Sequence, residues 1–235
     1  MSRPSSPESS PLAVELQGVG REFGERPVLQ GVTLQLAAGQ TLAILGANGA
    51  GKTTLLRLVA GLIEPTWGRA RVLGAKLPGE RGRLRGRVGL VGHDPLLYRD
   101  LTARENLALQ CRLHNLGPER VEELLGAVGA SRFADRPIRE LSRGMVQRVA
   151  VARALVASPP LLLLDEPQAN LDPQARANLE PLVGRASGRT RLLTSHEPQA
   201  ALREADLVLG LRAGRAAFLL PAESVGSREL EGLYR

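Results

Sequence analysis

Apolar and polar residues alternate near the start of the chain, in residues 12–19 and 28–36, and a glycine-containing turn separates the two segments. Alternation with period two is typical of strands that bury one face, so the pattern predicts an antiparallel hairpin. Residues 41–45 form a compact apolar segment and predict a buried strand. A glycine-rich turn follows this strand, and then a helix that we expect to reach Leu62.

Helical periodicity dominates the middle of the chain, from about residue 94 to residue 157. The expected helices span residues 103–113, 119–128 and 145–157. A short apolar strand at 88–91 precedes this block, and four leucines at 161–164 follow it. Short runs that are apolar at every position suit central strands of a parallel sheet, which are buried on both faces.

Two further apolar segments, 191–193 and 207–211, are separated by helical segments. Alternation of strands and helices predicts a mostly parallel α/β sheet, with the helical block of about 94–157 inserted into it. Residues 1–11 are rich in serine and proline and have no apolar stretch. We therefore expect a disordered tail there rather than a secretory signal.

Composition narrows the class of protein. Aromatic residues are only 3% of the chain, so the core must consist mainly of leucine, valine and alanine. A single cysteine excludes an internal disulfide framework. No apolar run approaches the roughly 18 residues that a membrane helix needs, so we expect a cytoplasmic protein that reaches membranes through a partner. The net charge of +7 is compatible with nucleic acid, anionic lipid or a phosphate-rich ligand, and also with compositional bias alone.

The segment after the strand at 41–45 matches the phosphate-binding pattern G-x-x-x-x-G-K-[ST] at every position. Glycines let the backbone wrap closely around a phosphate, and the start of the following helix adds partial positive charge. We expect Lys52 to reach the β- and γ-phosphates and Thr53 to offer its hydroxyl to Mg²⁺. The ATP-binding residues expected here are Gly46, Ala47, Asn48, Gly49, Ala50, Gly51, Lys52, Thr53 and Thr54.

An acidic pair follows the four-leucine strand. Asp165 ends that strand, where ligands bind in open α/β sheets, and its carboxylate can hold Mg²⁺. Glu166 comes next and is placed to polarise an attacking water as a general base. Together with the phosphate-binding loop, the pair predicts hydrolysis of ATP with Mg²⁺ as cofactor.

Residues 141–148 read Leu-Ser-Arg-Gly-Met-Val-Gln-Arg and open a helix shortly before the acidic pair. This stretch resembles the LSGGQ signature of ABC ATPases, and the resemblance covers about residues 12–220. It implies an α/β fold of the ABC nucleotide-binding type, with a RecA-like core, an antiparallel β subdomain and an inserted α-helical subdomain. Residues 221–235 form a separate C-terminal segment.

In this family two copies close head to tail around two ATP molecules, and the signature of one copy meets the γ-phosphate held by the other. Ser142 is a good N-cap for the signature helix. Arg143 and Met145 depart from the glycine and glutamine of the family, and Arg143 either adds charge near the phosphate or points to solvent. The expected signature residues are Leu141, Ser142, Arg143, Gly144 and Met145.

The resemblance also assigns roles outside these motifs. Phe23 lies where the family places an aromatic side chain that stacks on adenine, and the alternative is a core residue. His196 falls at the switch histidine, so the expected catalytic set is Glu166, His196 and Lys52. Residues of the D-loop, which crosses the dimer interface, are Asn170, Leu171 and Asp172.

His93 stands where the family usually has glutamine, in a loop that senses the γ-phosphate and connects to the membrane partner. A histidine there can still bond to water or to ligands of Mg²⁺. We therefore expect His93 among the ATP-binding residues, and also in the metal site together with Thr53 and Asp165. Unlike glutamine, histidine can change its charge near neutral pH.

The Val-Gly-His loop and the Ser-Arg-Gly-Met signature resemble one subgroup, the ATPase subunit of the heme exporter complex of bacterial cytochrome c maturation. This implies a homodimer bound to integral membrane permease subunits, peripheral on the inner face of the cell membrane. Exporters of lipids, drugs or other small molecules are the alternative. A soluble nucleic-acid-associated ABC ATPase agrees with the basic charge. However, the chain has neither a second ATPase domain nor sustained heptads, so we expect no nucleic-acid partner.

Overall fold

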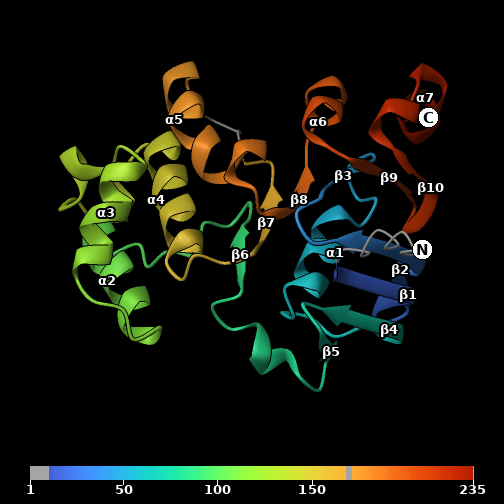
Figure 1. The fold of residues 1–235 in the computed structure, drawn as a ribbon, viewed down its shortest axis with the longest axis horizontal. Helices are drawn as coiled ribbons and strands as arrows, with labels where there is room; N and C mark the ends of the chain where they lie inside the picture. Colours follow the sequence, from blue (N-terminus) through green and yellow to red (C-terminus); the bar gives the residue numbers. More distant parts are fainter. Residues whose placement is uncertain (1–10, 168–170, 235) are drawn as a thin grey trace, which may run out of the picture.

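The computed structural model describes residues 11–167 and 171–234, which form two sheets with helices packed around them (Figure 1). Within the described residues, the first sheet is antiparallel and has the strand order β2-β1-β4-β5. Its strands are β1 (Leu12–Phe23), β2 (Arg26–Ala37), β4 (Trp67–Val72) and β5 (Ala75–Leu77). The hairpin expected from the alternating pattern is thus confirmed as β1 and β2, and both strands are longer than expected.

The second sheet has the order β10-β9-β3-β8-β7-β6 over the same described part of the chain. Its strands are β3 (Thr41–Leu45), β6 (Val88–Val91), β7 (Leu161–Asp165), β8 (Thr190–Thr194), β9 (Leu207–Arg212) and β10 (Arg215–Pro221). Every pairing is parallel except that of β10 with β9. The expected parallel sheet is confirmed, and β8 lies between β3 and β7.

Figure 1 shows α2, α3 and α4 gathered at one end of the molecule, with the antiparallel sheet at the other end. The helices are α1 (Lys52–Val59), α2 (Ala103–Leu113), α3 (Glu119–Ala127), α4 (Arg143–Leu155), α5 (Pro173–Val183), α6 (Pro198–Glu204) and α7 (Ser227–Tyr234). None of the helices in the described ranges has the length and apolar character needed to cross a membrane. The subdomain boundary of about 94–157 and the domain end at residue 220 stay predictions.

Helix ends depart from expectation where local capping decides them. Helix α1 ends at Val59, before Leu62, because Gly61 adopts a left-handed φ of 72° and the N–H of Leu62 turns back to the carbonyl of Arg57 at 3.0 Å. Helix α4 begins two residues earlier than expected and ends at Leu155. The tail predicted for residues 1–11 lies outside the described residues except for Pro11.

The four leucines of β7 divide between two hydrophobic cores. Leu162 and Leu164 pack in the core beneath the helical block, and Leu161 and Leu163 pack in the core shared with α1 and the antiparallel sheet. All four are at most 1% exposed, which confirms a strand buried on both faces. Such a strand is held in register by packing from two sides, so its carboxyl end is a rigid support for the acidic pair.

Candidate nucleotide-binding site

The phosphate-binding loop connects β3 to α1, and its backbone conformation requires glycine at two positions. Gly46 has a φ of 152°, and a Cβ atom there would lie 2.1 Å from the carbonyl oxygen of Leu211. Gly51 has a φ of 105°, and a Cβ atom would lie 2.8 Å from the carbonyl oxygen of Val28. Gly51 precedes α1 without a side-chain cap, so N–H groups of the first turn are available to an anion.

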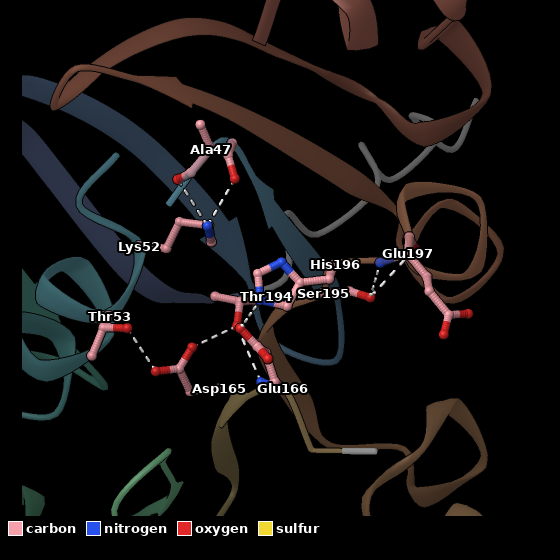
Figure 2. Close-up of polar contacts among 10 residues, drawn as sticks. Ala47, Lys52, Thr53, Asp165, Glu166, Thr194, Ser195, His196 and Glu197 are labelled. Carbon is pink, nitrogen blue, oxygen red and sulfur yellow. Dashed lines mark hydrogen bonds and ion pairs between the residues drawn. The ribbon is translucent and has the colours of Figure 1, made fainter. Parts of the chain in front are cut away.

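Lys52 folds its ammonium group back over the loop. Nζ donates to the carbonyl oxygens of Gly46 at 2.7 Å and Ala47 at 3.1 Å (Figure 2). Burial lowers the pKa of Lys52, while the nearby charges of Glu166 and Asp165 raise it. An ammonium that is partly stripped of water gains from an anionic ligand in the loop, so Lys52 is suited to bind phosphate.

The carboxylate of Asp165 joins the phosphate-binding loop to the end of β7. Its Oδ2 accepts a hydrogen bond from Thr53 Oγ1 at 2.7 Å, and its Oδ1 accepts one from Thr194 Oγ1 at 2.6 Å. The Asp165 side chain is buried, so these two bonds fix its orientation. Figure 2 shows this chain of contacts from Thr53 through Asp165 to Thr194.

The Thr53 hydroxyl and the Asp165 carboxylate fit Mg²⁺, which prefers oxygen ligands. Among residues 11–167 and 171–234, no group of three or more histidine, cysteine, aspartate or glutamate side chains could hold a metal ion alone.

Glu166 and His196 form a second pair beside Asp165. His196 Nε2 lies 2.6 Å from Glu166 Oε1, and both side chains are partly exposed, so a ligand can approach them. Glu166 has a left-handed φ of 55°, which residues other than glycine rarely adopt. Strain of this kind costs about 1–3 kcal/mol and gathers at functional sites. The backbone N–H of Glu166 donates to Thr194 Oγ1 at 3.1 Å.

A cavity of about 380 Å³ brings three separate motifs together. Its lining includes His93 from the loop after β6, Arg143 from the start of α4, and the acidic pair Asp165 and Glu166. Arg143 lines this cavity and is also exposed to solvent, so both expectations for its side chain, charge near the phosphate or a position in solvent, stay predictions. His93 reaches the same cavity, so the loop that carries it lies beside the acidic pair.

Ser142 caps α4 as expected, because its hydroxyl accepts a hydrogen bond from the N–H of Met145 at 3.3 Å. One turn later, Gln147 Nε2 donates to the carbonyl oxygen of Pro167 at 3.2 Å. The signature helix is therefore tied to the segment that follows Glu166. The contact of Gln147 was not expected from the sequence.

Phe23 is 47% exposed at the end of β1, so the alternative that it is a core residue is wrong. The guanidinium of Arg21 lies 4.5 Å from the centre of the Phe23 ring. Arg21 also donates to the carbonyl oxygen of Glu64 at 3.0 Å, which holds the guanidinium in place. A cation over one face of the ring leaves stacking to the other face.

Of the expected D-loop residues, Asn170 lies outside the described residues. Leu171 is buried, and Asp172 caps α5 by accepting a hydrogen bond from the N–H of Ala175 at 2.8 Å. The contribution of these residues to a dimer interface stays a prediction.

Besides Gln147, two residues near the site were not expected from the sequence, Thr194 and Arg21. Thr194 ends a strand whose neighbours in the sheet cannot be read from the order of the chain. Arg21 lies two residues before Phe23, a spacing that places both side chains on one face of a strand. That spacing was the available signal for Arg21.

Comparisons with known proteins agree with this geometry. Residues 29–169 match the family model described as ABC transporter. The Nod factor export ATP-binding protein I of Rhizobium johnstonii is 37% identical over 214 residues, which is 88% of this chain and 68% of that protein. A daunorubicin resistance ATP-binding protein of Streptomyces coeruleorubidus is 37% identical over 229 residues, or 92% of this chain and 72% of that protein.

Solved structures share the fold. A dimeric ATP-binding cassette in a post-hydrolysis state, bound to ADP and Pi, has a TM-score of 0.81 and 28% identity over 90% of this chain and all of that chain. A subunit of an ABC transporter complex from Clostridium perfringens has a TM-score of 0.77 and 25% identity over 94% of this chain and 92% of that one. The family model spans more than half of the chain, so the protein belongs to the ABC transporter family as one of its ATP-binding subunits, an ATPase whose hydrolysis of ATP is coupled to transport.

Proposed function

We propose that the chain binds MgATP between the phosphate-binding loop and the end of β7 and hydrolyses it with Glu166 as the general base. The observation that carries this proposal is the 2.7 Å hydrogen bond from Thr53 to Asp165, since it makes the first turn of α1 and the acidic strand end face one site. ATP is held by the loop, Lys52 binds its β- and γ-phosphates, and Thr53 and Asp165 hold the metal. Mg²⁺, when bound, supplies neutralisation of charge on the phosphate oxygens.

The chain's own residues then direct the chemistry. Glu166 accepts a proton from the attacking water, whose oxygen forms a bond to the γ-phosphorus while the bond to the bridging oxygen of ADP breaks. His196 holds the Glu166 carboxylate through the 2.6 Å contact between Nε2 and Oε1. His93 lines the same cavity and would bond there to water or to a ligand of the metal.

Replacement of Glu166 by glutamine tests this assignment. Glutamine has nearly the same shape but cannot accept the proton, so we expect ATP affinity to stay near the parental value while kcat falls about 100-fold or more. Parental turnover in Glu166→Gln is incompatible with Glu166 as the base. Glu123→Gln is a matched control, because Glu123 is exposed on α3, outside the cavity.

We also propose that two copies close head to tail, with Ser142 and Gly144 of one copy facing the γ-phosphate held by the other. The free N–H groups at the start of α4 suit an anion, and the related cassette with bound ADP and Pi is a dimer. Leu171 and Asp172 then belong to the interface.

For the cargo, we propose heme export in bacterial cytochrome c biogenesis. The support is the resemblance of the loop around His93 and of the signature from Ser142 to Met145. The ATPase pair is then peripheral on the inner face of the cell membrane, bound to separate integral membrane permease subunits.

A second cargo class is favoured by the relatives. Two of them, at 37% identity, are named for Nod factor export and daunorubicin resistance. Neither name refers to heme. These names favour an exporter of another small molecule, with the same ATPase chemistry and a different permease.

Capture of partners separates the two cargos. The Glu166→Gln protein is incubated with ATP and host membranes, and bound subunits are identified by mass spectrometry while the eluate is examined for heme absorption. Heme-handling subunits with a heme band support the cytochrome pathway, and another permease without heme overturns it. A Lys52→Met protein is the matched control, and its capture of the same subunits would show that they bind without nucleotide.

A further inference from the structure

Thr194 is the last residue of β8, the strand between β3 and β7, and its side chain is completely buried. The phosphate-binding loop follows β3, and the acidic pair ends and follows β7. Thr194 therefore lies between the two halves of the site, as Figure 2 shows. The two residues before it, Leu192 and Leu193, are apolar and buried, so packing alone would favour valine at this position.

The hydroxyl of Thr194 makes two hydrogen bonds of opposite direction. It donates to Asp165 Oδ1 at 2.6 Å and accepts from the backbone N–H of Glu166 at 3.1 Å. An ionised carboxylate can only accept, and a backbone N–H can only donate, so the direction of both bonds is fixed. One hydroxyl thus serves both members of the acidic pair at the same time.

For Asp165, the bond from Thr194 leaves the second carboxylate oxygen to the site. Oδ2 accepts a hydrogen bond from Thr53. In the proposed function, Thr53 and Asp165 would both hold Mg²⁺, so Oδ2 is the oxygen that would face the metal. The bond from Thr194 to Oδ1 does not use Oδ2, and the Thr194 side chain is buried, so this bond is compatible with a metal at Oδ2. The carboxylate therefore presents Oδ2 in a fixed direction without needing Thr53.

For Glu166, the bond from its N–H to Thr194 supports the left-handed backbone, whose φ is 55°. This conformation directs the side chain toward His196, which lies 2.6 Å away. Without the bond, the backbone is free to return to a more common conformation, and the carboxylate moves with it.

We propose that Thr194 is a positioning residue for ATP hydrolysis, in which a single buried hydroxyl sets the Asp165 carboxylate and the Glu166 backbone relative to each other. The inference rests on the roles proposed above for Asp165 and Glu166. Thr194 acts through these two residues and does not touch the nucleotide.

Two matched pairs of side chains isolate the hydroxyl. Threonine and Thr194→Val have nearly the same shape and both keep a γ-methyl group, while Thr194→Ser and Thr194→Ala both lack it. The first pair is the parent and Thr194→Val, and the second is Thr194→Ser and Thr194→Ala. Only the parent and Thr194→Ser carry the hydroxyl. If the valine protein does not fold, the serine and alanine proteins still test the proposal.

We expect loss of the hydroxyl to lower kcat by about 10- to 100-fold in both pairs, the range of one or two buried hydrogen bonds. The Mg²⁺ concentration for half-maximal activity should rise several-fold, whereas the Kd for ATP without Mg²⁺ stays within about twofold, because Lys52 and the loop backbone are unchanged. Thr194→Ser should restore kcat to within about threefold of the parent.

A merely structural Thr194 gives a different result. The hydroxyl-free proteins would then unfold at lower temperature while the folded fraction keeps parental kcat and Mg²⁺ dependence, and this outcome overturns the proposal. Failure of serine to exceed alanine also overturns it. The Glu166→Gln protein tests the proposed base separately from the role of Thr194. Parental turnover in Glu166→Gln rejects Glu166 as the base. The Mg²⁺ dependence of the Thr194 proteins still tests the bond from Thr194 to Asp165.

Discussion

The Lys52 ammonium lowers the stability of the nucleotide-free protein, and in the proposed function the same ammonium binds phosphate. Its pKa is lowered by burial in the folded chain, so the ammonium reduces stability at neutral pH, where the unfolded chain carries the charge without penalty. This penalty fades as the pH rises from the lowered pKa of folded Lys52 toward the pKa of lysine in the unfolded chain, and it is absent above the latter. Its present partners are the carbonyl oxygens of Gly46 and Ala47. In the proposed ATP complex, a phosphate would take their place.

We therefore predict that Lys52→Met does not lower the Tm of the nucleotide-free protein at pH 7 and removes most of the rise in Tm that ATP produces. Methionine fills the volume of the lysine stem without its charge. Thermal unfolding with and without ATP measures both effects. A normal ATP-induced rise in the variant would reject Lys52 as a phosphate ligand.

Phe23 is expected to contribute to recognition of the base and not of the phosphates. Stacking on an aromatic ring is worth about 1–3 kcal/mol, so Phe23→Ala should weaken ATP binding about 5- to 150-fold. Inorganic triphosphate, which has no base, should bind the parent and Phe23→Ala equally. Titration calorimetry with the two ligands gives this comparison. Equal loss for both ligands would instead indicate damage to the loop.

The positions of Lys52 and Thr53 after a buried strand could be predicted from the sequence, because the loop and its helix are adjacent in the chain and form a local unit; their roles stay predictions. The acidic pair was also found, since a fully apolar strand ending in Asp165 is a strong pattern. Sequence reasoning failed for Thr194, because a hydroxyl at the end of β8 gains its meaning only from strand order. Strand order depends on packing between distant segments.

At the scale of elements, the predicted segments with strong local signals agree with the structure, and the misses are weak signals. Strand β4 has Arg69 and Arg71 on its outward face, and only Ala70 and Val72 are buried, so its apolar pattern is short. Strand β10 is largely exposed, and α7 buries only Leu233. Such elements are stabilised by neighbours rather than by their own periodicity.

Helix α2 begins with a capping box, and its stability should depend on pH. The N–H of Thr102 donates to Glu105 at 2.8 Å, and this bond lowers the pKa of the Glu105 carboxyl. A carboxyl whose pKa is lowered by folding stabilises the protein above its unfolded pKa of about 4.3, and the contribution is lost as the pH falls through the lower folded value.

The Tm of Glu105→Gln should therefore lie below that of the parent at pH 7, and the difference should shrink toward zero as the pH falls below about 4. Glu25, in the turn between β1 and β2, caps no helix, and Glu25→Gln is the control with little difference at any pH. If the difference in Tm between the parent and Glu105→Gln stays constant from pH 7 to pH 3, the charge of the Glu105 carboxylate does not stabilise the cap.

At the scale of the whole molecule, the signature presents an ambiguity. Leu141 and Arg143 line the same cavity as Asp165 and Glu166 within one chain. This arrangement fits a site completed by the signature of the same chain, and it also fits a site completed by the signature of a second copy. The head-to-tail proposal requires the signature of a second copy. Substitutions that inactivate different motifs in different copies distinguish the two kinds of site.

We predict that mixing two inactive proteins restores hydrolysis. Lys52→Met keeps an intact signature, and Gly144→Glu keeps an intact phosphate-binding loop while its carboxylate repels the γ-phosphate. Glutamate in the first turn suits the helix dipole, so α4 should still form. In a head-to-tail pair, one of the two sites then has both intact parts, and the rate should rise as the two proteins are titrated together. Because a site within one chain would be broken in both proteins, a mixture that stays inactive while each protein keeps its fold would reject the shared site.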